Sequence, residues 1–115
     1  MKTEILPATA IDIETFYGEP PKRSMRAFVG LADGVPLACF GLYYDTGRMV
    51  LFSDIKPEAR RYRKTLVSGA FRVMDLAREL GVPVHAVAGC VDGSVRLLER
   101  LGFTRQGNLY VWEGV

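Results

Sequence analysis

Five cationic side chains lie within nine residues, between an apolar stretch and a long amphipathic one. They are Lys56, Arg60, Arg61, Arg63 and Lys64. Periodicity predicts a strand over residues 49–55 and a helix over about 59–80, so the cations surround the start of a helix. Helix N-termini expose free N–H groups and a partial positive charge. These features predict a site for a polyanionic ligand, and the alternative is a solvated basic face that binds nothing specific.

A second apolar stretch after the helix completes a strand–helix–strand unit. Gly81 ends the helix, and a strand is expected over residues 83–88. Such units are nearly always right-handed, and ligands bind in the crevice at the carboxyl ends of their strands. We therefore expect the ligand between residues 49–55 and 83–88.

Asp54, near the end of the first of these strands, is the candidate general base. Alternation along a strand places its side chain on the same face as Phe52. A carboxylate in this position can accept a proton from an attacking ammonium group, directly or through water. The alternative is a structural role, in which Asp54 caps the turn or pairs locally with Lys56 or Arg60.

Three other reactive side chains are expected to be packing residues. Cys39 and Cys90 are far apart and lie in apolar runs, which indicates buried thiols in a reducing compartment. His85, in an apolar strand, is expected to be a core residue with one satisfied nitrogen. Because it is the single histidine, we expect no zinc site of the usual Cys/His spacing, and no other metal site is predicted.

Length and composition fit one domain over residues 1–115, with 49% hydrophobic and 24% charged residues. A net charge of +2 is too small to indicate nucleic acid as a partner. Tyr62 alone is interleaved with the cations, whereas single-stranded nucleic acid requires several stacking aromatics. No stretch approaches the ~20 apolar residues of a membrane span, and no signal peptide is evident. The expected location is cytoplasmic.

Turn signals and periodicity give the remaining elements. We expect a strand at 3–6 and a short helix opened by a capping box at Thr9 and Asp12. Strands follow at 25–32, 36–44 and 48–55, joined by Asp33-Gly34 and Asp45-Thr46-Gly47 turns. The C-terminal part is expected to hold a helix ending near 101 and a hairpin around Gly107-Asn108. This order predicts an α+β fold with a mixed sheet. The sheet would combine an antiparallel meander, one parallel β-α-β crossover and a C-terminal hairpin.

Three segments of the chain match the sequence pattern of a known protein family. They are Pro57-Glu58-x-Arg60, Gly81-Val82-Pro83, and Ser94-x-x-Leu97-Leu98-Glu99-Arg100-Leu101-Gly102-Phe103 before the last hairpin. On the basis of these segments, the chain from about residue 25 to its end resembles the GCN5-related N-acetyltransferases (GNAT superfamily). Three further segments are similar to small acetyltransferase-like proteins of tailed bacteriophages: Tyr17-Gly18-x-Pro20-Pro21, Arg26-Ala27 and Phe52-Ser53-Asp54-x-Lys56-Pro57.

The resemblance implies an acyl-CoA N-acyltransferase that moves an acetyl group from acetyl-coenzyme A to an unidentified primary amine by direct attack, with Asp54 as the base. In the family, backbone amides of the turn hold the pyrophosphate, and the pantetheine pairs with the preceding strand. Carried onto this chain, the cofactor-binding residues are Ser53, Ile55, Arg60, Arg61, Arg63, Lys64, Thr65 and Leu66.

The chain departs from the family pattern at three positions. Two family glycines correspond to Arg63 and Thr65, and the family's tyrosine acid corresponds to Leu98. Tyr43 and Tyr110 are expected to be packing aromatics, and each is an alternative proton donor to the leaving thiolate. A non-catalytic GNAT-like binding or virion-associated phage protein, located in host cytoplasm or virion, is the alternative function. A partner subunit in a homodimer could cover the acceptor side.

Overall fold

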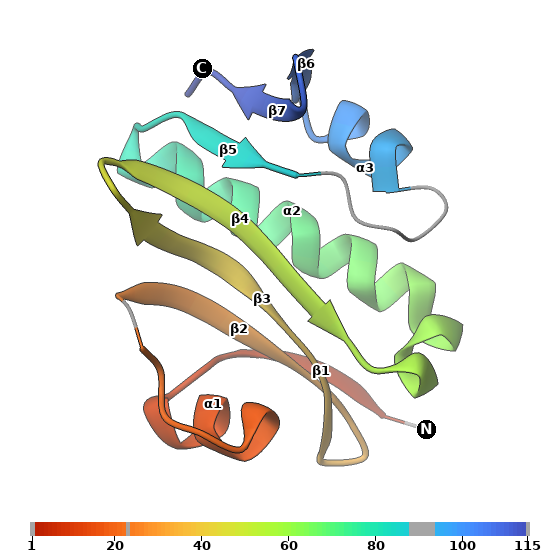
Figure 1. Cartoon of the computed structure of the whole chain (residues 1–115). Helices are drawn as coiled ribbons and strands as arrows, with labels where there is room; N and C mark the ends of the chain where they lie inside the picture. Colours follow the sequence, from red (N-terminus) through yellow and green to blue (C-terminus); the bar gives the residue numbers. More distant parts are fainter. Residues whose placement is uncertain (1, 23, 88–93, 115) are drawn as a thin grey trace.

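The computed structural model describes residues 2–22, 24–87 and 94–114. Its elements (Figure 1) are β1 (Thr3–Pro7), α1 (Ala10–Tyr17), β2 (Met25–Ala32), β3 (Val35–Asp45), β4 (Arg48–Ile55), the 3-10 helix η1 (Pro57–Tyr62), α2 (Arg63–Leu80), β5 (Val84–Ala86), α3 (Ser94–Arg100), β6 (Thr104–Gln106) and β7 (Leu109–Trp112). The α+β class and the predicted order of helices and strands are confirmed.

The described strands form one mixed sheet in the order β1-β2-β3-β4-β5-β7-β6. Every neighbouring pair is antiparallel except β4 and β5, which are parallel. Helix α2 is the crossover between these two strands. The predicted meander, single parallel crossover and C-terminal hairpin are therefore all present.

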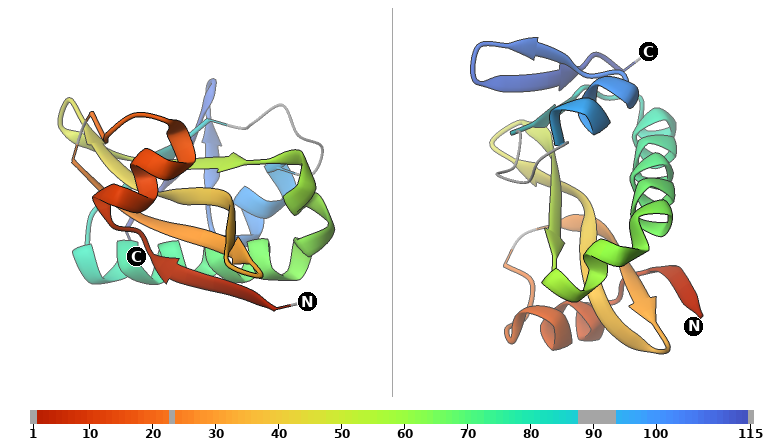
Figure 2. Two further views of the ribbon diagram at one scale, coloured as in Figure 1. Left: turned by 90° about the horizontal axis from the view of Figure 1, so that it is seen from below. Right: turned by 90° about the vertical axis from the view of Figure 1, so that its right-hand side faces the viewer.

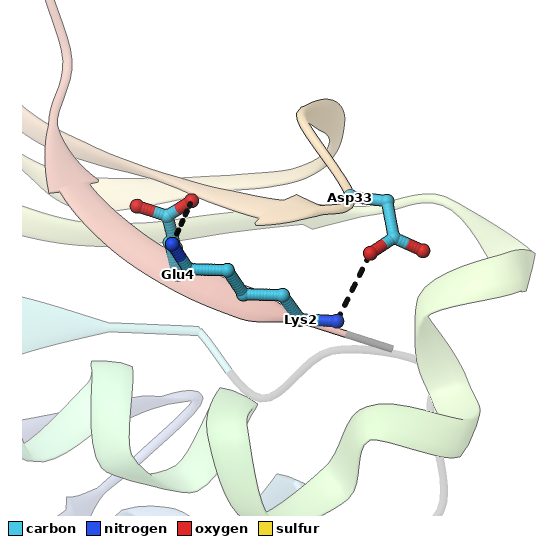
Figure 3. Close-up of polar contacts among 3 residues, drawn as sticks. All are labelled: Lys2, Glu4 and Asp33. Atoms are coloured by element: carbon cyan, nitrogen blue, oxygen red, sulfur yellow. Dashed lines mark hydrogen bonds and ion pairs between the residues drawn. The ribbon is translucent and has the colours of Figure 1, made fainter.

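Both turns of the meander have the geometry that their residues favour. Asp33 and Gly34 have φ of 49° and 81°, and Thr46 and Gly47 have φ of 49° and 85°. Two consecutive residues with positive φ make the turn that suits the twist of a hairpin. The first turn also holds the edge strand, because the Lys2 backbone N–H donates to Asp33 Oδ1 at 3.0 Å (Figure 3). Figure 3 also shows Lys2 Nζ paired with Glu4 at 3.9 Å.

The outer edge of β1 is partly closed by side chains. Hydrogen bonds from Asp33 N to Lys2 O and from Ala8 N to Ala27 O show which residues of β1 bond to β2, namely the even-numbered ones. The backbone groups of Ile5 therefore point outward, away from β2. Arg72 of α2 donates to the Ile5 carbonyl at 2.8 Å. Pro7, in the same outward phase, has no N–H to offer. These features reduce the tendency of the edge to pair with another strand.

The sheet lies between α1 on one face and α2 on the other (Figure 2). Strand β3 serves both sides: Phe40 and Leu42 belong to the large core with α2 and α3, whereas Cys39 belongs to a small cluster with Ile13 of α1. Gly41 between them is a close approach, because an added Cβ would lie 2.2 Å from the Arg26 carbonyl oxygen. A glycine is therefore required at this position of β3.

Helix α1 begins as predicted. The Asp12 N–H donates to Thr9 Oγ1 at 3.2 Å and the Thr9 N–H donates to Asp12 Oδ2 at 2.8 Å, which completes the capping box. Gly18, with φ of 82°, ends the helix. Within the described ranges, no helix has the length and apolar character needed to cross a membrane.

The prediction of one continuous helix over residues 59–80 is wrong in its first turn. Residues Pro57–Tyr62 form a 3-10 helix, and α2 begins at Arg63. The break lies at Tyr62, whose ψ of 43° is not helical. Strand β5 is shorter than the predicted 83–88, and position 88 lies outside the described residues.

Candidate functional site

Strand β4 is paired along its whole length on one side and only briefly on the other. Its antiparallel pairing with β3 runs from Arg48 to Ile55. Its parallel pairing with β5 covers only Met49 with Val84 and Val50 with His85. Figure 1 shows β4 running away from β5 beyond this point. Among the described strands, the second half of β4 thus has an open backbone edge, which can pair with an extended ligand.

The open edge leads into the basic turn. Pro57 occupies the first turn of η1, and the Ala59 N–H donates to the Lys56 carbonyl at 2.9 Å. Helix α2 then starts without a side-chain cap on its N-terminus. The first N–H groups of a helix have no intrahelical acceptor, so this uncapped end favours an anionic ligand.

The structure distributes the predicted cations rather than gathering all five in one place. The Lys56 ammonium lies 5.2 Å from the centre of the Phe16 ring on α1. The Arg61 guanidinium lies 5.0 Å from the Tyr62 ring and donates to the Tyr62 hydroxyl at 2.9 Å. Both side chains therefore have aromatic partners on the protein itself.

Lys64 lies on the side of α2 that faces β1. Thr65 Oγ1 lies 3.1 Å from Thr3 Oγ1, which turns this side of the helix toward β1. Lys64 and Thr65 line a shallow surface groove on that side, together with Thr3, Glu4, Ile5, Ser68 and Arg72. Further along α2, Phe71 contacts Arg100 of α3, with the guanidinium 6.0 Å from the ring centre.

Asp54 is held by a residue far away in the sequence. The Tyr17 hydroxyl donates to Asp54 Oδ2 at 2.5 Å. Neither Lys56 nor Arg60 supplies this contact, so the local pairing considered from sequence is not the one observed. Asp54 is directly opposite Cys39 on β3, and the two lie on the α1 face with Phe52, as alternation predicts.

The surroundings of Asp54 keep its two neighbours protonated. Burial raises the pKa of the Tyr17 phenol, and its hydrogen bond to Asp54 raises it further. Burial also raises the pKa of the Cys39 thiol. Tyr17 therefore remains a hydrogen-bond donor to the carboxylate at neutral pH. Cys39 is a buried free thiol, as predicted.

Asp54 and Tyr17 line a pocket of about 290 Å³ under α1, which we call the Asp54 pocket. Its described lining comes from α1, the loop after it and strands β2, β3 and β4. These residues are Ile13, Tyr17, Glu19, Pro20, Pro21, Lys22, Met25, Tyr43, Phe52 and Asp54. This volume is just below the range of about 300–1,000 Å³ that is typical of small-molecule sites.

Tyr17 is the site residue that sequence reasoning missed. It appeared only within the segment that resembles phage proteins, with no role of its own. Its partner lies 37 residues away, and no local spacing could reveal that pairing. The available signal was its position as the last residue of a well-capped helix before Gly18 and two prolines.

The other candidates have simpler surroundings. Leu98 and Tyr110 are buried in the large core, so a core leucine stands at the family's tyrosine position. Tyr43 lines the Asp54 pocket, 5.8 Å from Phe52 between ring centres. His85 is half-buried, and its Nδ1 is buried without a hydrogen-bond partner in the described part of the chain.

Two earlier expectations concern thiols and metals. Cys90 lies outside the described residues, so its surroundings are not defined. In residues 2–22, 24–87 and 94–114, no three His, Cys, Asp or Glu side chains are grouped so as to hold a metal ion.

Comparisons with solved structures find the same fold. The ribosomal-protein-S18-alanine N-acetyltransferase from Escherichia coli is 15% identical, with a TM-score of 0.69 over 96% of this chain and 90% of that one. The putative N-acetyltransferase YhhK from E. coli, bound to coenzyme A, is 16% identical, with a TM-score of 0.64 over 98% of this chain and 99% of that one. AtaTR bound with acetyl-coenzyme A is 11% identical, with a TM-score of 0.55 over 97% and 94%.

Neither protein-family models nor curated protein sequences gave a match. The structural likeness nevertheless covers almost the whole chain, so the fold is that of the GCN5-related N-acetyltransferases. The resemblance to the GCN5-related N-acetyltransferases that the sequence shows is confirmed at the level of the fold.

Proposed function

We propose that the protein is an acyl-CoA N-acyltransferase that transfers an acetyl group from acetyl-coenzyme A to a primary amine. The observation that carries this proposal is the separation of β4 from β5 after two residue pairs. It opens a backbone edge between the uncapped N-terminus of α2 and the Asp54 pocket. Two structures of the same fold, YhhK and AtaTR, contain coenzyme A or acetyl-coenzyme A.

The chain offers complementary groups to each part of the cofactor. The backbone of Ser53 and Ile55 lies on the open edge and would pair with the extended pantetheine arm. The first turn of α2, from Arg63 to Leu66, supplies N–H groups for the phosphates. Arg60, Arg61 and Arg63 add charge-assisted donors. Lys64 and Thr65 contribute through their backbone, because their side chains line the groove near β1.

Acetyl transfer then needs no covalent enzyme intermediate. The amine nitrogen attacks the thioester carbonyl carbon, a C–N bond forms, and the C–S bond breaks to release the coenzyme A thiolate. Asp54 accepts the proton that the ammonium group loses, directly or through a water molecule. The Tyr17 hydroxyl holds the carboxylate in place during this step. As the tetrahedral adduct collapses, its nitrogen loses a second proton and the departing thiolate takes one up, which gives the amide and the coenzyme A thiol.

A non-catalytic binding protein is the second candidate. Two observations favour it: Arg63 and Thr65 stand where the family has glycines, and Leu98 is 6% exposed in the core where the family has a tyrosine acid. This alternative predicts that acetyl-coenzyme A does not bind, or binds without turnover.

Isothermal titration with acetyl-coenzyme A distinguishes the two. We expect micromolar binding that weakens by ~100-fold or more in the Arg60→Ala/Arg63→Ala double variant, because each charge-assisted bond contributes about 1.5–3 kcal/mol. The matched control is Arg78→Ala/Arg105→Ala, which removes the same charge from exposed positions elsewhere and should bind as the parent does. No binding at millimolar ligand would favour the non-catalytic protein.

Asp54→Asn separates chemistry from cofactor binding. Coenzyme A release with an accepted amine should fall ~10²–10⁴-fold, the usual contribution of a general base. Acetyl-coenzyme A affinity should stay the same, because the carboxylate faces the pocket and not the basic turn. Unchanged turnover would rule out Asp54 as the base.

A further inference from the structure

The Asp54 pocket has walls that are mainly aromatic and apolar. Tyr43 and Phe52 form one side, with their rings tilted by 44° at 5.8 Å between centres. Tyr17 faces the pocket from α1, and its ring is braced edge-on by Phe16 at 4.8 Å. Ile13, Met25, Pro20 and Pro21 complete the apolar surface. Aromatic faces of this kind attract a cation as well as an apolar group.

The charged groups of the pocket favour one positive charge on the ligand. Among the described lining residues, Glu19 and Lys22 form an ion pair at 3.3 Å and neutralise each other at the exposed rim. Within this lining Asp54 therefore supplies the unbalanced charge, and the Lys56 ammonium lies outside it, over the Phe16 ring. Its Oδ2 accepts one hydrogen bond from Tyr17, and a carboxylate has about four acceptor sites, so it can accept further bonds from a ligand.

We propose that the Asp54 pocket selects an acceptor with one ammonium group on a compact aromatic or apolar body, such as an arylalkylamine. The inference rests on the proposed function, because it names the amine that the transferase would use. Asp54 receives the ammonium, and the rings of Tyr43 and Phe52 contact the body of the ligand. Tyr17 is a positioning residue, which orients the carboxylate through its hydroxyl.

The pocket discriminates against three other classes of compound. An acid or a phosphate would meet the Asp54 carboxylate with no balancing cation among the described lining residues other than Lys22, which is already paired. A diamine would place its second ammonium among residues whose other carboxylate, Glu19, is already paired with Lys22. A neutral alcohol would fit the walls but lose the charge-assisted bond to Asp54.

Binding without acetyl-coenzyme A tests this selectivity directly. The probe is 2-phenylethylamine, titrated into the full chain and followed by ligand-observed NMR. We expect it to bind at least ~10-fold more tightly than 2-phenylethanol, 3-phenylpropionate or 1,4-diaminobutane, because one charge-assisted hydrogen bond contributes about 1.5–3 kcal/mol. Equal or tighter binding of any of these three compounds would overturn the proposal. So would tighter binding of a tri-alanine peptide with a free N-terminus.

Three variants locate the binding within the pocket. Asp54→Asn should weaken 2-phenylethylamine by ~10-fold or more and leave 2-phenylethanol within twofold. Tyr17→Phe keeps the ring and removes the hydroxyl, so a smaller loss, about threefold, is expected for the amine alone. Glu14→Gln is the matched control on α1, because Glu14 is exposed and outside the lining. A loss in Glu14→Gln equal to that in Asp54→Asn would contradict the assignment.

The acetyl-coenzyme A titration on the same preparation separates the two proposals. If the cofactor binds and 2-phenylethylamine does not, the acceptor class is wrong and the transferase proposal stands. If the amine binds and the cofactor does not, the pocket is an ammonium site in a protein that is not an acetyltransferase.

Discussion

The two faces of the sheet are packed to different degrees, although β3 and β4 send side chains to both. The α2 face holds thirteen buried residues in one cluster within the described part of the chain. The α1 face holds three, Ile13, Ala27 and Cys39, beside an open pocket. Helix α2 has eighteen residues and α1 has eight, so α1 covers less of its face.

This difference indicates that the two faces of the sheet have different roles. A face packed as densely as a protein interior leaves no room for a ligand. The partly covered face leaves Asp54 accessible beside Tyr17. We therefore expect substitutions on the α2 face to change mainly stability, and those on the α1 face to change mainly ligand binding.

The largest effect is expected from truncating a side chain on the α2 face. Met74 is 0% exposed, and Met74→Ala should lower the free energy of unfolding by about 2–5 kcal/mol. Ile13 on the other face is 6% exposed, and Ile13→Ala should cost about 2 kcal/mol, at the lower end of this range, because its surroundings adjoin the pocket and can rearrange. Urea unfolding of both variants measures the difference. Equal losses of unfolding free energy in the two variants would contradict the difference in packing between the two faces.

An added methyl group tests how tightly α2 is seated. A Cβ on Gly69 would lie 2.5 Å from Cζ of Phe40, well inside van der Waals contact. Gly69→Ala should therefore destabilise the protein by about 1–3 kcal/mol, despite the higher helix propensity of alanine. Ser68→Ala, at the adjacent exposed position, is the control and should change stability little. A Gly69→Ala protein as stable as the parent would show that this face is loosely packed.

Loss of the capping box tests the thinner α1 face. Thr9→Ala removes the acceptor of the Asp12 N–H and should cost about 1 kcal/mol. Because α1 carries Tyr17, the same change should also weaken 2-phenylethylamine binding. Thermal unfolding and the amine titration together check this. A stability loss with unaltered amine affinity would mean that α1 does not set the geometry of the pocket.

The smallest effect is expected in alkaline solution. The pKa of Tyr17 and that of Cys39 are both raised by burial, so the folded protein keeps these protons at pH values where the unfolded chain loses them. Stability should therefore fall as the pH rises above about 9–10, the ordinary range of these groups. The contribution of Tyr17 is limited, because its side chain is 39% exposed. Urea unfolding from pH 7 to 11 should show that the free energy of unfolding declines less steeply in Tyr17→Phe than in the parent protein. Identical slopes would contradict a contribution of Tyr17 to this pH dependence.

Much of the fold could be predicted because the interactions that specify it are local. The Asp33-Gly34 turn needs two residues that accept positive φ, and the capping box joins residues three apart. The helix boundary near Tyr62 was the local error. Pro57 starts a helical segment, but the chain must first turn back over the end of β4, where the Lys56 N–H donates to the Leu37 carbonyl. The 3-10 geometry accommodates this turn before α2 begins.

The sequence by itself determined the order of the elements, the alternation that places Asp54 on the same face as Phe52, and the presence of a basic turn before α2. Periodicity and turn chemistry depend on residues a few positions apart, so they can be recognised in the chain. Tertiary structure alone decided where β4 leaves β5, that the Lys56 ammonium lies over the Phe16 ring, and that Tyr17 holds Asp54. These depend on strand divergence and on contacts between residues tens of positions apart, which no local pattern specifies.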